Sequence, residues 1–131
     1  MAYSFDIFWV MKLRIRENSI RLRLTRSEVA ELAEKGLVEN VTEFGNAKLI
    51  YALRNSESAQ SVRANFANSR IEILVPKTMS DDWTKGEEVG ISGDEGALKI
   101  MVEKDFVCLT AREGEDESDA FPHPKERVIN C

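Results

Sequence analysis

Residues 12–28 read KLRIRENSIRLRLTRSE, and their alternation of apolar and basic side chains predicts a β-hairpin. Apolar side chains occupy every second position of residues 13–15 and again of residues 20–24. A period of two places one such set on one face of a strand. The apolar positions change parity between the two runs, so a turn or bulge at residues 17–19 must absorb the shift.

A helix is predicted directly after the hairpin. Thr25 and Glu28 have the spacing of a capping box, in which each side chain accepts a hydrogen bond from the other residue's backbone amide. Lys35 suits the negative end of the helix dipole, and Gly36 suits the left-handed conformation that ends many helices. These signals place a short helix at residues 26–35.

The remainder of the chain to residue 111 reads mainly as strands. Period-two patterns bounded by turn residues predict strands near residues 38–44, 48–54, 62–66, 71–75, 89–91 and 98–104. Residues 78–85 are expected to form a helical turn that packs Met79 and Trp83 into the core. No internal sequence repeat is evident. We therefore predict an α+β fold: a mainly antiparallel, curled sheet or partly closed barrel of seven to eight short strands, with one short helix after the first hairpin.

The composition is that of one folded domain with a distinct tail. The chain has 131 residues, a net charge of −5 and a sequence pI of about 5.0. An acidic domain repels phosphate backbones at long range, which argues against a general nucleic-acid partner. We divide the chain into an apolar leader at residues 1–10, an α+β domain at 11–111 and an acidic, proline-containing segment at 112–131.

The leader and the cysteines favour the cytoplasm. Residues 1–10 lack the charged start and cleavage site of a signal peptide and are too few to cross a bilayer as a helix. The leader is either an added edge strand or an artefact before a true start at Met11. Cys108 and Cys131 are widely separated, and we expect both to be reduced thiols.

Three stretches carry a family resemblance: KLRIRENSIRLRLT at residues 12–25, EFGNAKLIYAL at 43–53, and VEKDFVCL at 102–109 followed by an acidic run and FPHP. Together they resemble an uncharacterised bacterial family of small cytosolic proteins. The likeness runs from Met11 to about Pro124. It implies no activity, cofactor or catalytic residue, and it leaves the leader outside.

Four arginines are the candidate binding residues. Arg14, Arg16, Arg21 and Arg23 would share the hairpin face opposite the core, where guanidinium groups can bind phosphate or carboxylate bidentately. If the sheet closes, this face lines a polar interior like that of a triphosphate-processing tunnel enzyme, with Glu43, Glu72 or Glu103 as metal-holding carboxylates. The alternative is an ordinary solvated face of an antiparallel strand.

The acidic run offers a different partner for the same arginines. Residues 113–119 hold five acids and are interpreted as a solvated charge run, or as a segment lying across the arginine face within one chain or between chains. His123, Cys108 and Cys131 match no zinc-site spacing, so no metal site is predicted. Trp9, Tyr51, Phe66 and Trp83 fit core packing or stacking on bases.

The sequence marks no catalytic residue and no cofactor. It favours a non-enzymatic binding or protein-interaction module that self-associates through an exposed strand edge or binds an unknown protein. The alternative is an anion-binding domain for a small phosphate or triphosphate ligand, or a metal-dependent hydrolase, using the arginine-lined face. We expect no membrane partner.

Overall fold

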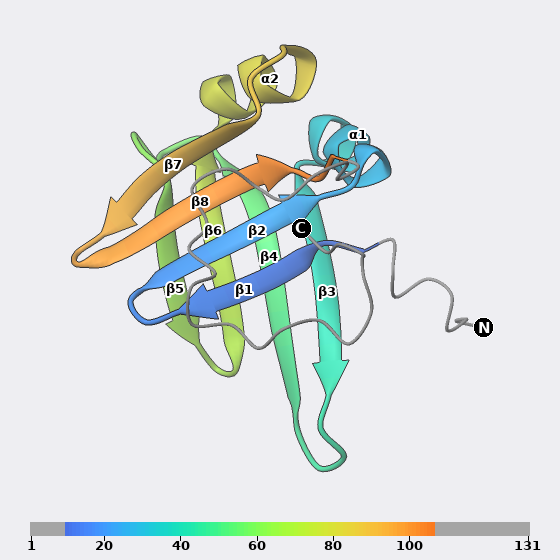
Figure 1. Ribbon diagram of the computed structural model, residues 1–131, viewed down its shortest axis with the longest axis vertical. Helices are drawn as coiled ribbons and strands as arrows, with labels where there is room; N and C mark the ends of the chain where they lie inside the picture. The colour runs from blue at the N-terminus through green and yellow to red at the C-terminus, as the bar shows by residue number, and fades with distance from the viewer. Residues whose placement is uncertain (1–9, 107–131) are drawn as a thin grey trace, which may run out of the picture.

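A computed structural model describes residues 10–106, which form eight strands and two helices (Figure 1). In chain order the elements are β1 (Lys12–Arg16), β2 (Ser19–Leu24), α1 (Arg26–Lys35), β3 (Leu37–Glu43), β4 (Lys48–Ser56), β5 (Arg63–Ala67), β6 (Arg70–Pro76), α2 (Lys77–Lys85), β7 (Gly90–Glu95) and β8 (Leu98–Lys104). No helix among these residues is long and apolar enough to span a membrane.

The strands form two separate four-stranded sheets, which corrects the prediction of one curled sheet or a partly closed barrel. The first sheet has the order β1-β2-β8-β7 and the second β3-β4-β6-β5. Each sheet is mixed, because its outer pairs are antiparallel hairpins and its central pair, β2–β8 or β4–β6, is parallel. Alternation along one strand says which face is buried but not which strand lies alongside, so the sequence pattern left the pairing open.

The two halves of the chain repeat one topology. A hairpin, a helix and a second hairpin occur as β1-β2-α1-β3-β4 and again as β5-β6-α2-β7-β8. The counterparts of β1, β2, β3 and β4 are β5, β6, β7 and β8. When each strand of the first sheet is replaced by its counterpart, the order becomes β5-β6-β4-β3, which is the order of the second sheet read backwards. The repeat is weak in the sequence, because buried counterparts such as Leu22 and Ile73 share only their apolar character, while outward counterparts such as Arg21 and Glu72 differ in charge.

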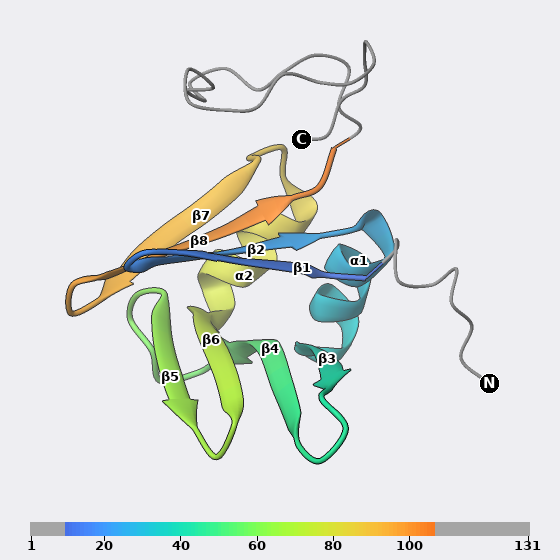
Figure 2. The same ribbon diagram turned by 60° about the horizontal axis from the view of Figure 1, so that its bottom comes forward.

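The hydrophobic core lies between the sheets, whose strands cross steeply in Figure 1. Leu22, Leu53, Ile73 and Val102 from the central strands are fully or almost fully buried. α1 and α2 follow the ends of β2 and β6 and contact each other at one end of the sandwich (Figure 2). The second helix is longer than the predicted turn, and Trp83 is buried as expected.

One edge of the sandwich is closed by a backbone contact. A Cβ atom added to Gly93 of β7 would lie 2.4 Å from the carbonyl oxygen of Val62, just before β5. No side chain fits at that distance, so glycine is required where the two sheets meet. Asn40 occupies the counterpart position in β3.

The predicted capping box is confirmed, and it is also a junction between elements. The Glu28 carboxylate accepts hydrogen bonds from the Thr25 amide at 3.0 Å and from the Met11 amide at 2.6 Å. The Tyr51 hydroxyl of β4 donates to the Met11 carbonyl at 2.8 Å, and burial and then the Glu28 charge raise the pKa of Tyr51. Gly36 ends α1 in the left-handed conformation, as predicted.

The cap gives a direct test of this junction. Thr25→Ala removes the hydroxyl that accepts a hydrogen bond from the Glu28 amide. We therefore expect the free energy of unfolding to fall by about 1 kcal/mol. Chemical denaturation measures the change. Ser27→Ala, on an exposed residue of the same helical turn, is the matched control. Equal stability of the two variants would show that the cap contributes nothing.

Candidate functional site

The four predicted arginines lie together on the outward face of the first sheet. The pairing of β1 with β2 sets Arg14 directly opposite Arg21 and Lys12 opposite Arg23, while Leu13 opposite Leu22 faces the core. The predicted hairpin and its shared face are therefore confirmed. We call the surface formed by Arg14, Arg16, Arg21 and Arg23 the arginine face.

Acidic side chains neutralise the positive charge of only part of the arginine face. Glu103 of β8 lies 3.3 Å from Arg23 Nε and 3.7 Å from Arg21 Nε. Asp105 pairs with Lys12 at 3.0 Å. Among residues 10–106, no carboxylate forms an ion pair with Arg14 or Arg16, and both side chains are exposed.

Arg23 is the unusual member of this face. Its exposed fraction is 5%, although it lies on the outward side of a sheet. Its Nη2 atom is buried and has no hydrogen-bond partner within the described residues. A buried polar group without a hydrogen-bond partner lowers the stability of the fold by about 1–3 kcal/mol. An acceptor placed beside this nitrogen would therefore be stabilising.

The expected tunnel arrangement is wrong for the described chain. The sheets do not close, and the arginines point away from the space between them. Glu103 lies on the first sheet and Glu72 on the second, where Arg54 and Arg70 bind it. Burial pushes the pKa of Glu72 upward, but the hydrogen bonds from these two arginines outweigh it and lower that pKa. Within residues 10–106 no carboxylate cluster that could hold a metal is present.

Several other candidates can now be placed. Trp83 is buried in the core, and Tyr51 is buried against Met11, so neither presents a ring for stacking on bases. Phe66, in contrast, is exposed. Trp9, Cys108, His123, Cys131 and the acidic residues 113–119 lie outside the described residues.

An apolar groove lies between the two sheets and is lined by strand residues. It lies at the end where the hairpins turn, away from the helices, and has a volume of about 500 Å³. Its walls include three pairs of counterparts from the two repeats: Ile15 with Phe66, Ile20 with Ile71, and Leu49 with Leu98. We call this recess the apolar groove.

Two large apolar side chains stand at the mouth of the groove. Ile15 is 58% exposed and Phe66 is 69% exposed. The alternation in β1 assigned Ile15 to the core, which is wrong, because its side chain lines an open recess between the two sheets. Strand alternation cannot distinguish a core side chain from one that lines an open recess. The sequence signal that could have indicated the recess is the presence of large apolar residues, Ile15 and Phe66, at the same position of the two repeats.

The polar groups beside the groove are already engaged. The Ser19 hydroxyl donates to the Arg16 carbonyl at 2.7 Å. The Glu95 carboxylate accepts from Arg63 Nε at 2.6 Å and from the Ala64 amide at 3.1 Å, which joins β7 to β5. These hydrogen bonds, the one from Arg63 first, lower the pKa of Glu95 to about 2. The lining of the groove is therefore mainly hydrocarbon.

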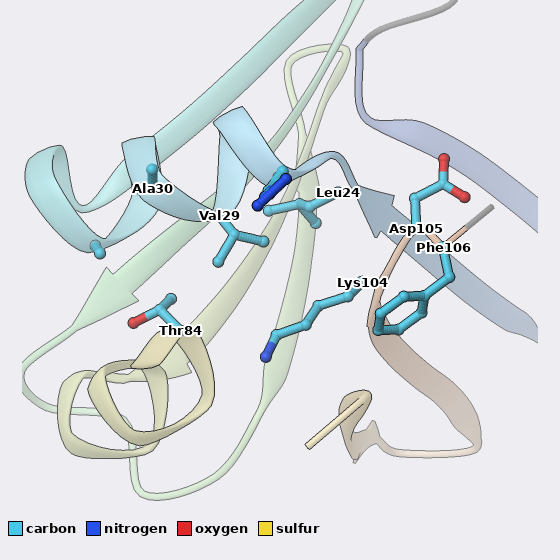
Figure 3. A pocket seen from close by; sticks show the side chains of 9 residues that line it. Leu24, Val29, Ala30, Thr84, Lys104, Asp105 and Phe106 are labelled. Carbon is cyan, nitrogen blue, oxygen red and sulfur yellow. The ribbon is translucent and has the colours of Figure 1, made fainter. Parts of the chain in front are cut away.

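A second recess lies outside α1, with a volume of about 640 Å³. Figure 3 shows Val29 of α1, Thr84 of α2 and Lys104 of β8 pointing toward one another across it. The Lys104 ammonium group in this recess already has partners within the protein. Its Nζ atom donates to the Gly86 carbonyl at 2.9 Å and lies 5.4 Å from the Trp83 ring centroid. Phe106, where the described chain ends, forms part of the wall.

Comparison with known proteins identifies a family. A family model described as a family of unknown function, DUF7009, matches residues 11–125. The chain belongs to DUF7009. No curated protein and no solved structure matches it significantly. The DUF7009 match covers both sheets and includes the acidic residues 113–119.

The Glu95–Arg63 pair predicts a specific pH dependence of stability. The pKa of Glu95 is depressed in the folded state, so its contribution is complete above about pH 4.5 and is lost as pH falls toward 2. We expect the melting temperature of the DUF7009 domain to fall over this window, and to fall less in Glu95→Gln.

Asp94→Asn is the matched control, because Asp94 is the neighbouring acid and makes an exposed pair with Lys99. Thermal melts from pH 6 to pH 2 measure the difference. Parallel pH profiles for Glu95→Gln and the unmodified protein would contradict the assignment.

Proposed function

We propose that this domain is a protein-interaction module that self-associates through the apolar groove. The observation that carries the proposal is the exposure of Ile15 and Phe66 at the mouth of a recess with aliphatic walls. Large apolar side chains exposed together mark interaction surfaces, because leaving them in water is unfavourable.

A second copy of the chain is the occupant that this groove suits. In a two-fold dimer the same patch serves both partners, so the patch must complement itself. The apolar groove supplies both halves of such a contact, a recess and two protruding side chains. Each repeat contributes one of the protruding residues and one half of each wall pair. The two walls of the groove therefore carry equivalent residues.

The chemistry of the groove supports binding rather than a reaction. Of its polar members, Ser19 and Glu95 already bond to the protein itself, and the remaining walls are mainly hydrocarbon. A catalytic group needs a free proton, lone pair or metal directed at a substrate. We therefore place this domain among interaction modules.

Sedimentation equilibrium from micromolar to several hundred micromolar tests the proposal. We expect a reversible dimer for the unmodified protein and a monomer for Ile15→Glu and for Phe66→Glu, because each places a charge in the apolar contact. Val41→Glu, on the outward face of β3, is the matched control, since Val41 is half exposed but lies away from the groove.

Circular dichroism of each variant checks that the fold is retained, and Phe66→Ala provides a milder change. A monomer at every concentration of the unmodified protein would refute self-association. A dimer that survives both Ile15→Glu and Phe66→Glu would place the interface elsewhere.

A second candidate function is anion binding at the arginine face. Arg14 and Arg16 are exposed and without a carboxylate partner in the described part of the chain, which supports this candidate. It predicts that inorganic triphosphate raises the melting temperature more than sodium chloride of equal ionic strength. Arg14→Gln with Arg16→Gln should abolish that difference, while Lys48→Gln on the second sheet should not. Equal shifts with both salts would reject the candidate.

A further inference from the structure

The arginine face carries a charge arrangement that is unfavourable by itself. Arg14 lies directly opposite Arg21 and Lys12 directly opposite Arg23 across the β1–β2 pair. Like charges at such cross-strand positions destabilise a hairpin. Glu103 and Asp105 offset one side of the face, but within residues 10–106 nothing acidic pairs with Arg14 or Arg16.

Arg23 carries a guanidinium nitrogen on this face that has no acceptor among the described residues. Glu103 binds its Nε atom, whereas its buried Nη2 has no described acceptor. A guanidinium group at 5% exposure cannot rely on bulk water to satisfy its remaining N–H groups. A carboxylate or phosphate laid over the outward side of β2 would satisfy them.

The chain itself carries such acceptors within reach. Asp105 holds the end of β8 beside Lys12, at the start of the basic row on β1. The seven residue-to-residue steps from Phe106 to Glu113 can span up to about 24 Å when the chain is extended. β1, with five residues, is about 17 Å long. Residues 113–119 can therefore reach every arginine of the face.

We infer that the acidic segment 113–119 binds the arginine face of its own chain, with its carboxylates between the paired arginines. The segment holds five acids, Glu113, Glu115, Asp116, Glu117 and Asp119. The attachment of the segment to β8 makes this contact intramolecular, which raises its effective concentration. An external polyanion must displace the segment, so the segment sets the affinity of the face for such ligands.

Paramagnetic broadening in the full chain tests the inference. A nitroxide is attached at Ser118→Cys after Cys108→Ser and Cys131→Ser. We expect loss of amide signals at Arg14, Arg16 and Arg21, with smaller losses at second-sheet residues. The signals should return in 0.5 M sodium chloride, where the screening length falls to about 4 Å.

Three controls make the outcome decisive. The same label at Ser58→Cys, in the exposed loop after β4, should leave the arginine face unchanged. Replacing the five acids by their amides should restore the signals and lower the Kd for inorganic triphosphate at least tenfold. Broadening no greater on β1 and β2 than on the second sheet overturns the inference.

A mixture of spin-labelled chain with unlabelled, isotope-enriched chain separates an intrachain contact from one between copies. Broadening that is as strong in this mixture as within a single chain would overturn the intrachain assignment. The test does not depend on the apolar groove, because it is also performed on Phe66→Glu. Failure of self-association and failure of the acidic contact are therefore distinguishable.

Discussion

The arrangement of the elements depends on the hydrogen bonds that the Glu28 carboxylate accepts. It accepts from the amide of Met11, where the chain enters the first sheet, and from Thr25, where α1 begins. Through the Met11 carbonyl, the same junction reaches Tyr51 of the second sheet. One buried side chain thus fixes an edge strand, a helix start and the opposite sheet relative to one another. Without it, the Met11 amide, the Thr25 amide and the Thr25 hydroxyl would need new acceptors in a region with little access to water.

Local structure could be predicted from the sequence wherever one residue pattern has one physical solution. The capping box at Thr25 and Glu28, the left-handed Gly36 and the alternation in residues 12–24 all specify a conformation without reference to distant residues. The outward direction of Arg14 and Arg21 followed from the same alternation. Burial of Trp83 followed from the prediction of a helical turn at residues 78–85 that packs Met79 and Trp83 into the core.

The pairing of strands and the candidate site could not be predicted in this way. β2 and β8 are adjacent although about 80 residues separate paired side chains such as Arg23 and Glu103, and alternation carries no information about that partner. Ile15 has the sequence signature of a core residue, but it lines an open recess between the sheets and is exposed. The groove is likewise a property of two sheets meeting, and its residues come from seven strands of the chain.

The exchange of hairpins between the repeats has a consequence for how the protein is made. Each half of the chain gives one hairpin to each sheet, so neither half can complete a sheet from its own strands. On the ribosome, β1 and β2 emerge before the other described strands but must wait for β8, the last strand of residues 10–106, before their sheet acquires its central pair. Long-range parallel pairing of this kind folds slowly because distant segments must meet before any contact is gained. During synthesis the basic hairpin therefore remains an incomplete sheet until translation of the domain is nearly finished, and its charge keeps that exposed edge from associating with other nascent chains.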